Sequence, residues 1–251
     1  MKPDDTLPQL KNLQAGLCQH IWNLLSPAHC LCGLFLILSV PSVWAQPPEV
    51  SASSHESIVW CDIWISHANE TNLPRVLLIG DSIARDYYPN VEKNLAGKAY
   101  VARLATSRFI GDPVLLQELA LVLENTKFQV IHFNNGMHGW QHSEVVYQRA
   151  FPKFLATIRQ YAPKAKLIWA TTTSLRNSSA GNSADASDER IDARNAFAQG
   201  YITKSGIETD DLNTLMRSHP EYHRDNVHFN DHGVQLQSQQ VAKVISESLS
   251  Q

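Results

Sequence analysis

The sequence predicts an α/β fold: a three-layer α/β/α sandwich with a doubly wound, mostly parallel sheet of five strands. From residue 76 onward, short apolar runs alternate with stretches of helical spacing. The first run, Val76–Ile79, is continuously hydrophobic, as strands are when both faces of a sheet are covered. Strands that alternate with helices are typical of βαβ units joined in one parallel sheet.

Each expected element follows from its own pattern. The expected strands are the short apolar runs, and they span 76–79, 98–104, 128–133, 165–172 and 206–212. The expected helices carry an apolar stripe at helical spacing, and they span 83–95, 113–125, 144–161, 189–205 and 231–249. Pro113 suits the first turn of its helix, whereas Pro89 and Pro152 predict a kink or break. The polar residues 173–188 predict a surface loop.

The bulk composition excludes two classes of partner. The chain has 251 residues, 43% hydrophobic and 18% charged, which is ordinary for a globular protein. Its net charge is −3, from 21 basic and 24 acidic residues. Neither sign dominates, so we expect neither a nucleic-acid partner nor an anionic membrane surface as a partner. No stable protein partner is inferred from the sequence.

The N-terminal region reads differently from the rest. Its apolar run, LCGLFLILSV and the residues up to Trp44, is interrupted by Pro41 and is short of the ~20 residues that a membrane span needs. Val43 and Ala45 supply the small residues of a signal cleavage site. We therefore expect a signal peptide or N-terminal anchor over 1–45, a linker and N-terminal extension over 46–72, and one domain over 73–251. Such a protein is exported, to the periplasm or outside the cell, with membrane anchoring as the alternative.

Cleavage of that leader would leave Cys61 as the remaining cysteine, because the other three precede it. The domain would then have no internal disulfide. The apolar setting IVWCDIW predicts a buried, unreactive thiol.

Gly80, Asp81 and Ser82 follow the first apolar run with no turn sequence between. One interpretation is a turn that caps the next helix, and Asp81 then accepts hydrogen bonds from nearby backbone N–H groups. The other is that Ser82 is a nucleophile, since functional groups of doubly wound sheets collect beyond the carboxyl ends of the strands.

A second pattern bears on this choice. Asp225 and His228 stand three residues apart, just before the last helix. A serine hydroxyl needs a base within hydrogen-bond reach, and the base needs an acceptor that fixes its tautomer. By itself the pair is more typical of a polar loop in which Asp225 caps a turn and His228 is solvated.

Together, Gly-Asp-Ser after the first strand and Asp-x-x-His before the last helix resemble the SGNH hydrolase superfamily, the GDSL-type esterases. The resemblance covers roughly residues 73–249 and implies the flavodoxin-like fold of that superfamily. Gly111-Asp112 matches the family's glycine block. The asparagine block departs from the family's Gly-x-Asn-Asp, because this chain reads HFNNGMHGW over 132–140. Asn134 is the preferred asparagine, and Asn135 remains the alternative.

The resemblance implies a serine esterase that acts through an acyl-enzyme and needs no cofactor. Ser82 would attack, His228 would accept its proton, and Asp225 would orient the imidazole. The backbone N–H groups of Ser82 and Gly111 and the amide of Asn134 would form the oxyanion hole. The expected substrate is a small-molecule or carbohydrate ester, most simply a short acetyl ester. The alternatives are a lipase or thioesterase for longer chains, or a noncatalytic glycan-binding relic.

Four further side chains are candidates for substrate binding because they stand close in sequence to the serine, glycine or asparagine block. These are Tyr87, Trp140, Arg85 and Arg108. Histidines at four-residue spacing invite a metal hypothesis, but no carboxylate or thiol cluster accompanies them, so we expect no metal.

Overall fold

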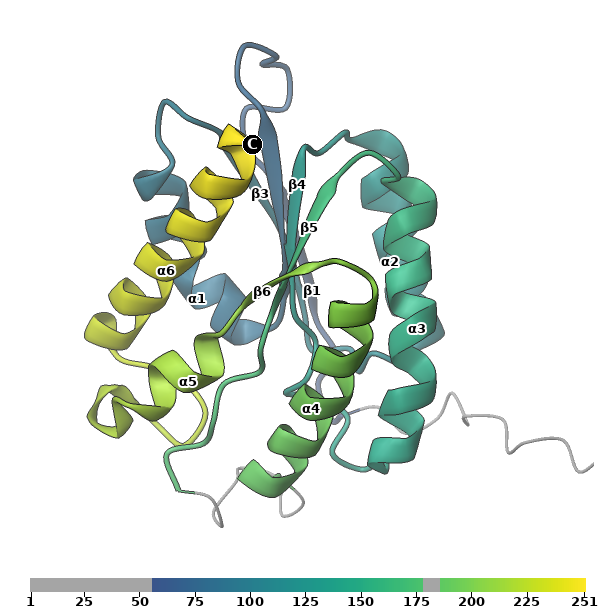
Figure 1. Ribbon diagram of the computed structural model, residues 1–251, viewed down its shortest axis with the longest axis vertical. Coiled ribbons are helices and arrows are strands. Elements are labelled where there is room, and N and C mark those ends of the chain that lie inside the picture. Colours follow the sequence, from purple (N-terminus) through teal and green to yellow (C-terminus); the bar gives the residue numbers. More distant parts are fainter. Residues whose placement is uncertain (1–55, 178–185) are drawn as a thin grey trace, which may run out of the picture. The chain divides into compact units, whose positions relative to one another are not determined.

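The computed structural model describes residues 56–177 and 186–251, so the expected leader over 1–45 lies outside the described residues. The described chain forms one six-stranded mixed sheet of order β1-β3-β2-β4-β5-β6 (Figure 1). The strands are β1 (Cys61–Ile65), β2 (Arg75–Gly80), β3 (Tyr100–Thr106), β4 (Val130–Phe133), β5 (Lys166–Ala170) and β6 (Glu208–Asp210). β1 runs antiparallel to β3, and every other pairing is parallel. The expected α/β class, with a mostly parallel sheet, is confirmed.

Helices cover both faces of this sheet. They are α1 (Ser82–Asn94), α2 (Pro113–Asn125), α3 (Glu144–Tyr161), α4 (Asp188–Lys204), α5 (Leu212–Arg217) and α6 (Asp231–Ser250). α1 and α6 lie on one face and α2, α3 and α4 on the other (Figure 1). No helix in these described ranges is long and apolar enough to cross a membrane.

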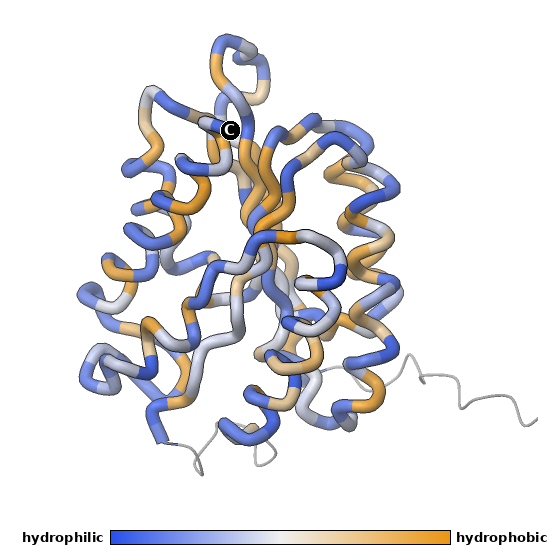
Figure 2. The backbone as a smooth tube through the Cα atoms, in the orientation of Figure 1, coloured by the Kyte–Doolittle hydropathy of each residue, from blue (hydrophilic) through white to orange (hydrophobic). Residues whose placement is uncertain are grey.

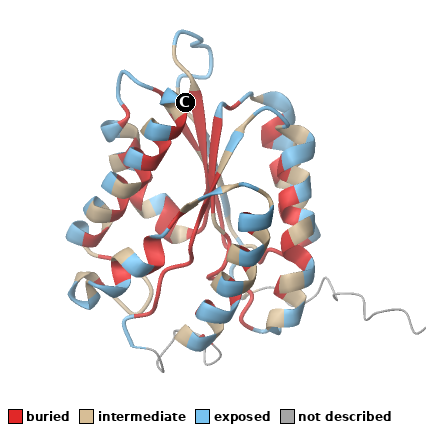
Figure 3. Ribbon diagram, viewed as in Figure 1, coloured by how far each residue is buried: buried red, intermediate tan, exposed pale blue. Residues whose placement is uncertain are grey.

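The core has two parts, one on each side of the sheet. One gathers residues of α1, α5 and α6, and the other gathers residues of α2, α3 and α4. The hydropathy colouring of Figure 2 and the burial colouring of Figure 3 both show the central strands as apolar and buried. All six residues of β2 are buried, which matches the continuous apolar run that predicted it.

The structure corrects three details of the expected fold. β1 is a sixth strand, and it lies within the expected linker 46–72, so the domain begins before residue 73. The last strand is shorter than expected, because α5 already begins at Leu212. Pro89 and Pro152 lie inside α1 and α3, which continue past them without ending.

The parallel strands bring their carboxyl ends to one edge of the sheet, and there the site is assembled. Ile79 of β2 pairs with Phe133 of β4, which pairs with Trp169 of β5. The residues that follow these strands are therefore neighbours. Gly80 permits a tight passage into α1, since a Cβ there would lie 2.5 Å from the Cβ of Ala84.

Candidate active site

Ser82 is the first residue of α1, and Asp81 is its N-cap. The Asp81 carboxylate accepts a hydrogen bond of 2.9 Å from the backbone N–H of Ile83, so its expected role as a structural acid is confirmed. The turn Gly80–Ser82 therefore caps helix α1 and also positions the Ser82 side chain. The backbone N–H of Ser82 has no acceptor among the described residues. It lies at the N-terminus of α1, which is the positive end of the helix dipole.

The structure places Ser82, His228 and Asp225 in one hydrogen-bonded row. Ser82 Oγ lies 2.8 Å from His228 Nε2, although the two residues are 146 positions apart. On the other side of the ring, His228 Nδ1 lies 2.9 Å from Asp225 Oδ2 and 3.2 Å from Oδ1. This is the order hydroxyl, imidazole, carboxylate that a serine nucleophile needs.

Local hydrogen bonds hold the turn that carries Asp225 and His228. Asp225 Oδ1 accepts hydrogen bonds of 2.8 Å from the backbone N–H groups of both Val227 and His228. The next residue, Phe229, is buried in the core and anchors the turn at the start of α6. The pair is therefore fixed before any substrate binds.

The hydrogen bonds to Asp225 also favour the charged form of its carboxyl group. Partial burial alone would raise the pKa of this carboxyl, but hydrogen bonds from the backbone of His228 and Val227 and from the His228 ring outweigh it and lower the pKa. The carboxylate is thus stabilised as the anion that holds the Nδ1–H tautomer of His228, with Nε2 facing the serine hydroxyl.

Gly111 lies in the loop between β3 and α2, at the same edge of the sheet as Ser82. Its backbone N–H has no acceptor among the described residues, whereas the N–H of Asp112 next to it donates to the Phe109 carbonyl at 2.8 Å. The glycine N–H is therefore free to donate to a ligand.

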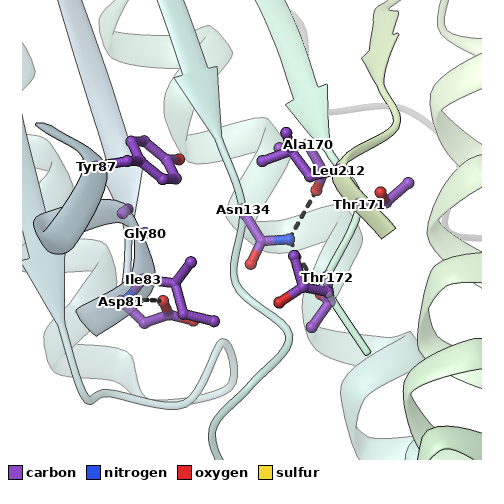
Figure 4. Close-up of a pocket in the computed structure, with 11 residues that line it drawn as sticks. Gly80, Asp81, Ile83, Tyr87, Asn134, Ala170, Thr171, Thr172 and Leu212 are labelled. Carbon is purple, nitrogen blue, oxygen red and sulfur yellow. Dashed lines mark hydrogen bonds between the residues drawn. The ribbon is translucent and has the colours of Figure 1, made fainter. Parts of the chain in front are cut away.

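The asparagine block differs from the expectation. Asn134 Nδ2 donates to the Ala170 carbonyl at 2.7 Å and to Thr172 Oγ1 at 3.0 Å, and Figure 4 shows this nitrogen turned toward these two residues. Both amide hydrogens are used, so Asn134 holds the ends of β4 and β5 together and has no hydrogen left for an oxyanion.

Asn135 has a spare donor. It is buried, and its Nδ2 donates to the Arg108 carbonyl at 3.0 Å, which leaves one amide hydrogen without an acceptor among the described residues. Arg108 belongs to the loop that carries Gly111. Of the two asparagines, the alternative, Asn135, is therefore the one whose amide still has a hydrogen to donate.

A small cavity lies behind the serine turn, between β2, β4 and β5. Its lining includes Asp81, Tyr87, Asn134 and Thr172, and its volume of about 20 Å³ holds roughly one water molecule (Figure 4). Tyr87 points its hydroxyl into this space (Figure 4). Burial and the charges of Asp210 and Asp81 raise its pKa well above the ordinary value, so the hydroxyl stays protonated.

Three of the four expected substrate contacts are engaged inside the protein. Tyr87 is only 2% exposed and lies in the core, not at a cleft mouth. Trp140 is 7% exposed, and the guanidinium groups of Arg190 and Arg194 lie 5.3 and 4.1 Å from its ring centre. Arg108 is ion-paired with Asp112 at 2.9 Å and Glu118 at 2.7 Å. These interpretations are corrected, because none of the three side chains is free to bind a substrate.

Arg85 is the exception. It is exposed, one turn along α1 from Ser82, and no carboxylate among the described residues pairs with it. Its guanidinium lies 4.5 Å from the ring centre of Trp60. Trp60 is hydrogen-bonded to Ser107, after the end of β3, so this cation–π pair stands beside the serine turn.

The sequence pattern did not single out His138 and Glu56, two residues that the structure pairs. His138, in the loop after β4, places Nδ1 2.8 Å from Glu56 Oε1, across 82 positions of the chain. His138 lies within the quoted asparagine block, but nothing in the sequence marks its partner.

Within the described ranges, no three or more of the His, Cys, Asp and Glu side chains group as a metal site would require.

Comparison with known proteins places this geometry in a fold class. No family model and no curated protein matches the sequence. Solved structures do match: a GDSL-like lipase from Bacteroides thetaiotaomicron VPI-5482 has 14% identity and a TM-score of 0.57 over 70% of this chain and 89% of its own. A carbohydrate esterase family 3 protein from Talaromyces cellulolyticus has 17% identity and a TM-score of 0.56 over 70% and 98%. A mutant acetyl esterase crystallised with an acetate ion has 16% identity and a TM-score of 0.57 over 70% and 98%.

The described domain therefore has the fold of the SGNH, or GDSL-like, hydrolases. At these identities the likeness establishes the fold, and the fold expected from the resemblance is confirmed.

Proposed function

We propose that this protein is a serine ester hydrolase that acts through an acyl-enzyme, with Ser82, His228 and Asp225 as its catalytic triad. The observation that carries the proposal is the hydrogen-bonded row from Ser82 Oγ through the His228 ring to Asp225. The neighbours of the same fold, described as lipases and esterases, agree with it.

In this mechanism His228 Nε2 accepts the hydroxyl proton as Ser82 Oγ bonds to the ester carbonyl carbon. The resulting imidazolium gives that proton to the leaving alcohol oxygen as the ester C–O bond breaks. Water then attacks the acyl-enzyme by the same route, and the carboxylic acid and the free Ser82 hydroxyl result. Asp225 orients the ring throughout and keeps its charge.

The developing oxyanion is stabilised by donors at the sheet edge. The free backbone N–H groups of Ser82 and Gly111 supply two of them. We assign the asparagine contribution to Asn135 in place of Asn134, because one hydrogen of its amide remains available. Losing one such donor typically costs about 3–4 kcal/mol of transition-state stabilisation.

We assign the acyl part to a short group such as acetate, by analogy with the neighbour described as an acetyl esterase. The alcohol part would face outward, where Arg85 and Trp60 lie. A carbohydrate acetate is therefore the proposed substrate, by analogy with the neighbours described as acetyl and carbohydrate esterases.

Export through the N-terminal apolar segment remains part of this proposal. N-terminal sequencing of the protein recovered from outside the cytoplasm tests it. A chain that begins at Gln46 supports a cleaved signal peptide, and a retained Met1 supports the uncleaved anchor. Protein found in the cytoplasm alone would contradict export.

The decisive experiment is hydrolysis of p-nitrophenyl acetate by the wild type, Ser82→Ala and the exposed control Ser250→Ala. We expect Ser82→Ala to lose about 10⁴-fold or more in kcat while Ser250→Ala matches the wild type. A fluorophosphonate probe should form a covalent adduct on Ser82. Folded wild-type protein that neither hydrolyses the ester nor forms the adduct would contradict the proposal. A profile from acetate to palmitate that peaks at long chains would contradict the short-acyl assignment alone.

A further inference from the structure

Arg85 is an exposed cation beside the serine turn that no acidic side chain in the described ranges neutralises. Its backbone N–H donates to the carbonyl of Asp81, the residue before Ser82, at 3.0 Å. Arg85 therefore lies one turn along α1 from the serine, and its exposed side chain can be reached by a ligand.

The geometry of the helix directs this side chain toward Ser82. Residues three apart on a helix share one face, and their Cβ atoms are about 5–6 Å apart. Helical side chains also lean toward the N-terminus, so Arg85 extends back over the turn that contains Ser82. The next residue, Asp86, instead contacts Arg224 at 3.4 Å, and Arg224 precedes Asp225 of the candidate triad. By helical spacing, Ser82 lies between the Arg85 side and the Asp86 side of α1.

Trp60 fixes the position of the guanidinium. The central carbon of the Arg85 guanidinium lies 4.5 Å from the ring centre of Trp60. The N–H of Trp60 donates to Ser107 Oγ at 3.0 Å, and its carbonyl accepts from the Ser107 N–H at 3.1 Å. Ser107 directly follows β3, whose last residues pair with the end of β2. Trp60 therefore holds the guanidinium at the edge of the sheet where the serine turn begins.

This arrangement suits a carboxylate ligand. A guanidinium that lies over an aromatic ring uses its flat face for that contact, and the N–H groups along its edge stay available. These N–H groups form a planar fork that matches the two oxygens of a carboxylate. Arg108 and Arg224 are also near this edge, but Arg108 is ion-paired with Asp112, and Arg224 with Asp86. An anionic group on a substrate would therefore meet Arg85.

We propose that Arg85, positioned by Trp60, is a specificity-determining residue that binds a carboxylate on the alcohol part of the ester. The acyl part is assigned to acetate, so the carboxylate belongs to the alcohol and leaves with it. The substrate class is then an O-acetylated carbohydrate that carries a carboxylate, as a uronic acid unit does. This inference rests on the proposed ester hydrolase function and deepens it by naming the substrate class.

Two small probes test this charge preference. The alcohol part of 3-acetoxybenzoate carries a carboxylate, and that of methyl 3-acetoxybenzoate carries a neutral ester at the same position. Release of acetate is measured for both, and the ratio of their kcat/KM values is the carboxylate selectivity. Comparing this ratio between variants cancels the difference in the intrinsic reactivity of the two probes.

Three variants and one control should then differ in this selectivity. Arg85→Gln should lower it about 10-fold, mainly through a higher KM for 3-acetoxybenzoate. Arg85→Lys keeps the charge but loses the fork, so its loss should be smaller. Trp60→Leu removes the aromatic face that positions Arg85 and should lower the selectivity as well. Arg149→Gln removes an exposed arginine of α3, on the other face of the sheet, and should match the wild type. Thermal melting confirms that each variant is folded.

The outcomes separate the two proposals. If the wild type and Ser82→Ala are equally inactive on p-nitrophenyl acetate and on both probes, the hydrolase proposal and this inference both fail. If hydrolysis depends on Ser82 but 3-acetoxybenzoate is not a substrate, only this inference fails. It also fails if folded Arg85→Gln keeps the wild-type selectivity, whether or not its rates fall. An equal drop in Arg149→Gln overturns it too, because the overall charge of the protein would then attract the anion.

Discussion

The ring of Phe109 occupies the space into which a side chain on Gly139 would have to extend. A Cβ at Gly139 would lie 2.8 Å from the Cβ of Phe109 and closer still to its ring. Phe109 belongs to the loop of Gly111, and Gly139 to the loop of His138. The contact therefore locks together the two loops that flank the serine turn.

This contact predicts a difference between two glycine substitutions. Gly139 and Gly97 have nearly the same backbone φ, +77° and +76°, but a Cβ at Gly97 would meet nothing within 4 Å. Gly97→Ala should cost only the left-handed strain, about 1 kcal/mol of unfolding free energy. Gly139→Ala should cost about 1–3 kcal/mol more, from overpacking against Phe109. Urea denaturation measures both, and equal losses in the two variants would contradict the contact.

The two asparagines after β4 should respond differently to truncation. Asn135→Ala should lower kcat by about 10²–10³-fold, because it removes a donor from the oxyanion hole. Asn134→Ala should lower the unfolding free energy by about 1–3 kcal/mol, because it breaks the link from β4 to Ala170 and Thr172. Kinetics and denaturation measured on both variants decide the matter. A reversed pattern would return the catalytic role to Asn134.

Features that nearby residues determine could be predicted from the sequence, whereas features that depend on tertiary contacts could not. The parallel strands were predictable because their burial on both faces forces a continuous apolar run, as in β2. β1 was not predicted from the sequence, because it is an edge strand with exposed Ile63 and Trp64 and has no continuous apolar run. Asp225 and His228 form a local turn, which their spacing shows.

The remaining site features depend on tertiary contacts. The pairing of His138 with Glu56 spans 82 positions, and no local pattern encodes it. The direction of the Asn134 amide depends on where β5 ends. Trp140 resembled a cleft aromatic, but the stacking of Arg194 on its ring, from α4, puts it in the interior.

The lowered pKa of Asp225 predicts how stability depends on pH. Its carboxyl titrates below the ordinary value of 3.8 in the folded state, so folding binds fewer protons at this group than the unfolded chain does. The resulting stabilisation is complete above the unfolded pKa and is lost as pH falls through the folded one. Thermal melting of wild type and Asp225→Asn over roughly pH 2–6 tests this. The difference in Tm should be constant near pH 6 and shrink toward pH 2, and a difference that grows on acidification would contradict it.

Cys61 combines exposure with low reactivity, and this yields the last prediction. The residue is exposed, not buried as the sequence suggested. Local desolvation of its sulfur, followed by the charge of Glu118, nevertheless raises the thiol pKa to about 12. The thiolate fraction at pH 8 is then far below that of a free cysteine.

Alkylation by iodoacetamide at pH 8 should accordingly be about 50-fold slower than that of glutathione, after allowing for the greater nucleophilicity of a more basic thiolate. Glu118→Gln removes the charge that opposes ionisation and should speed the reaction. Mass spectrometry of Cys61 over time measures both rates. Labelling of the wild type as fast as glutathione would contradict the raised pKa, and a Glu118→Gln rate equal to that of the wild type would show that Glu118 does not govern the thiol.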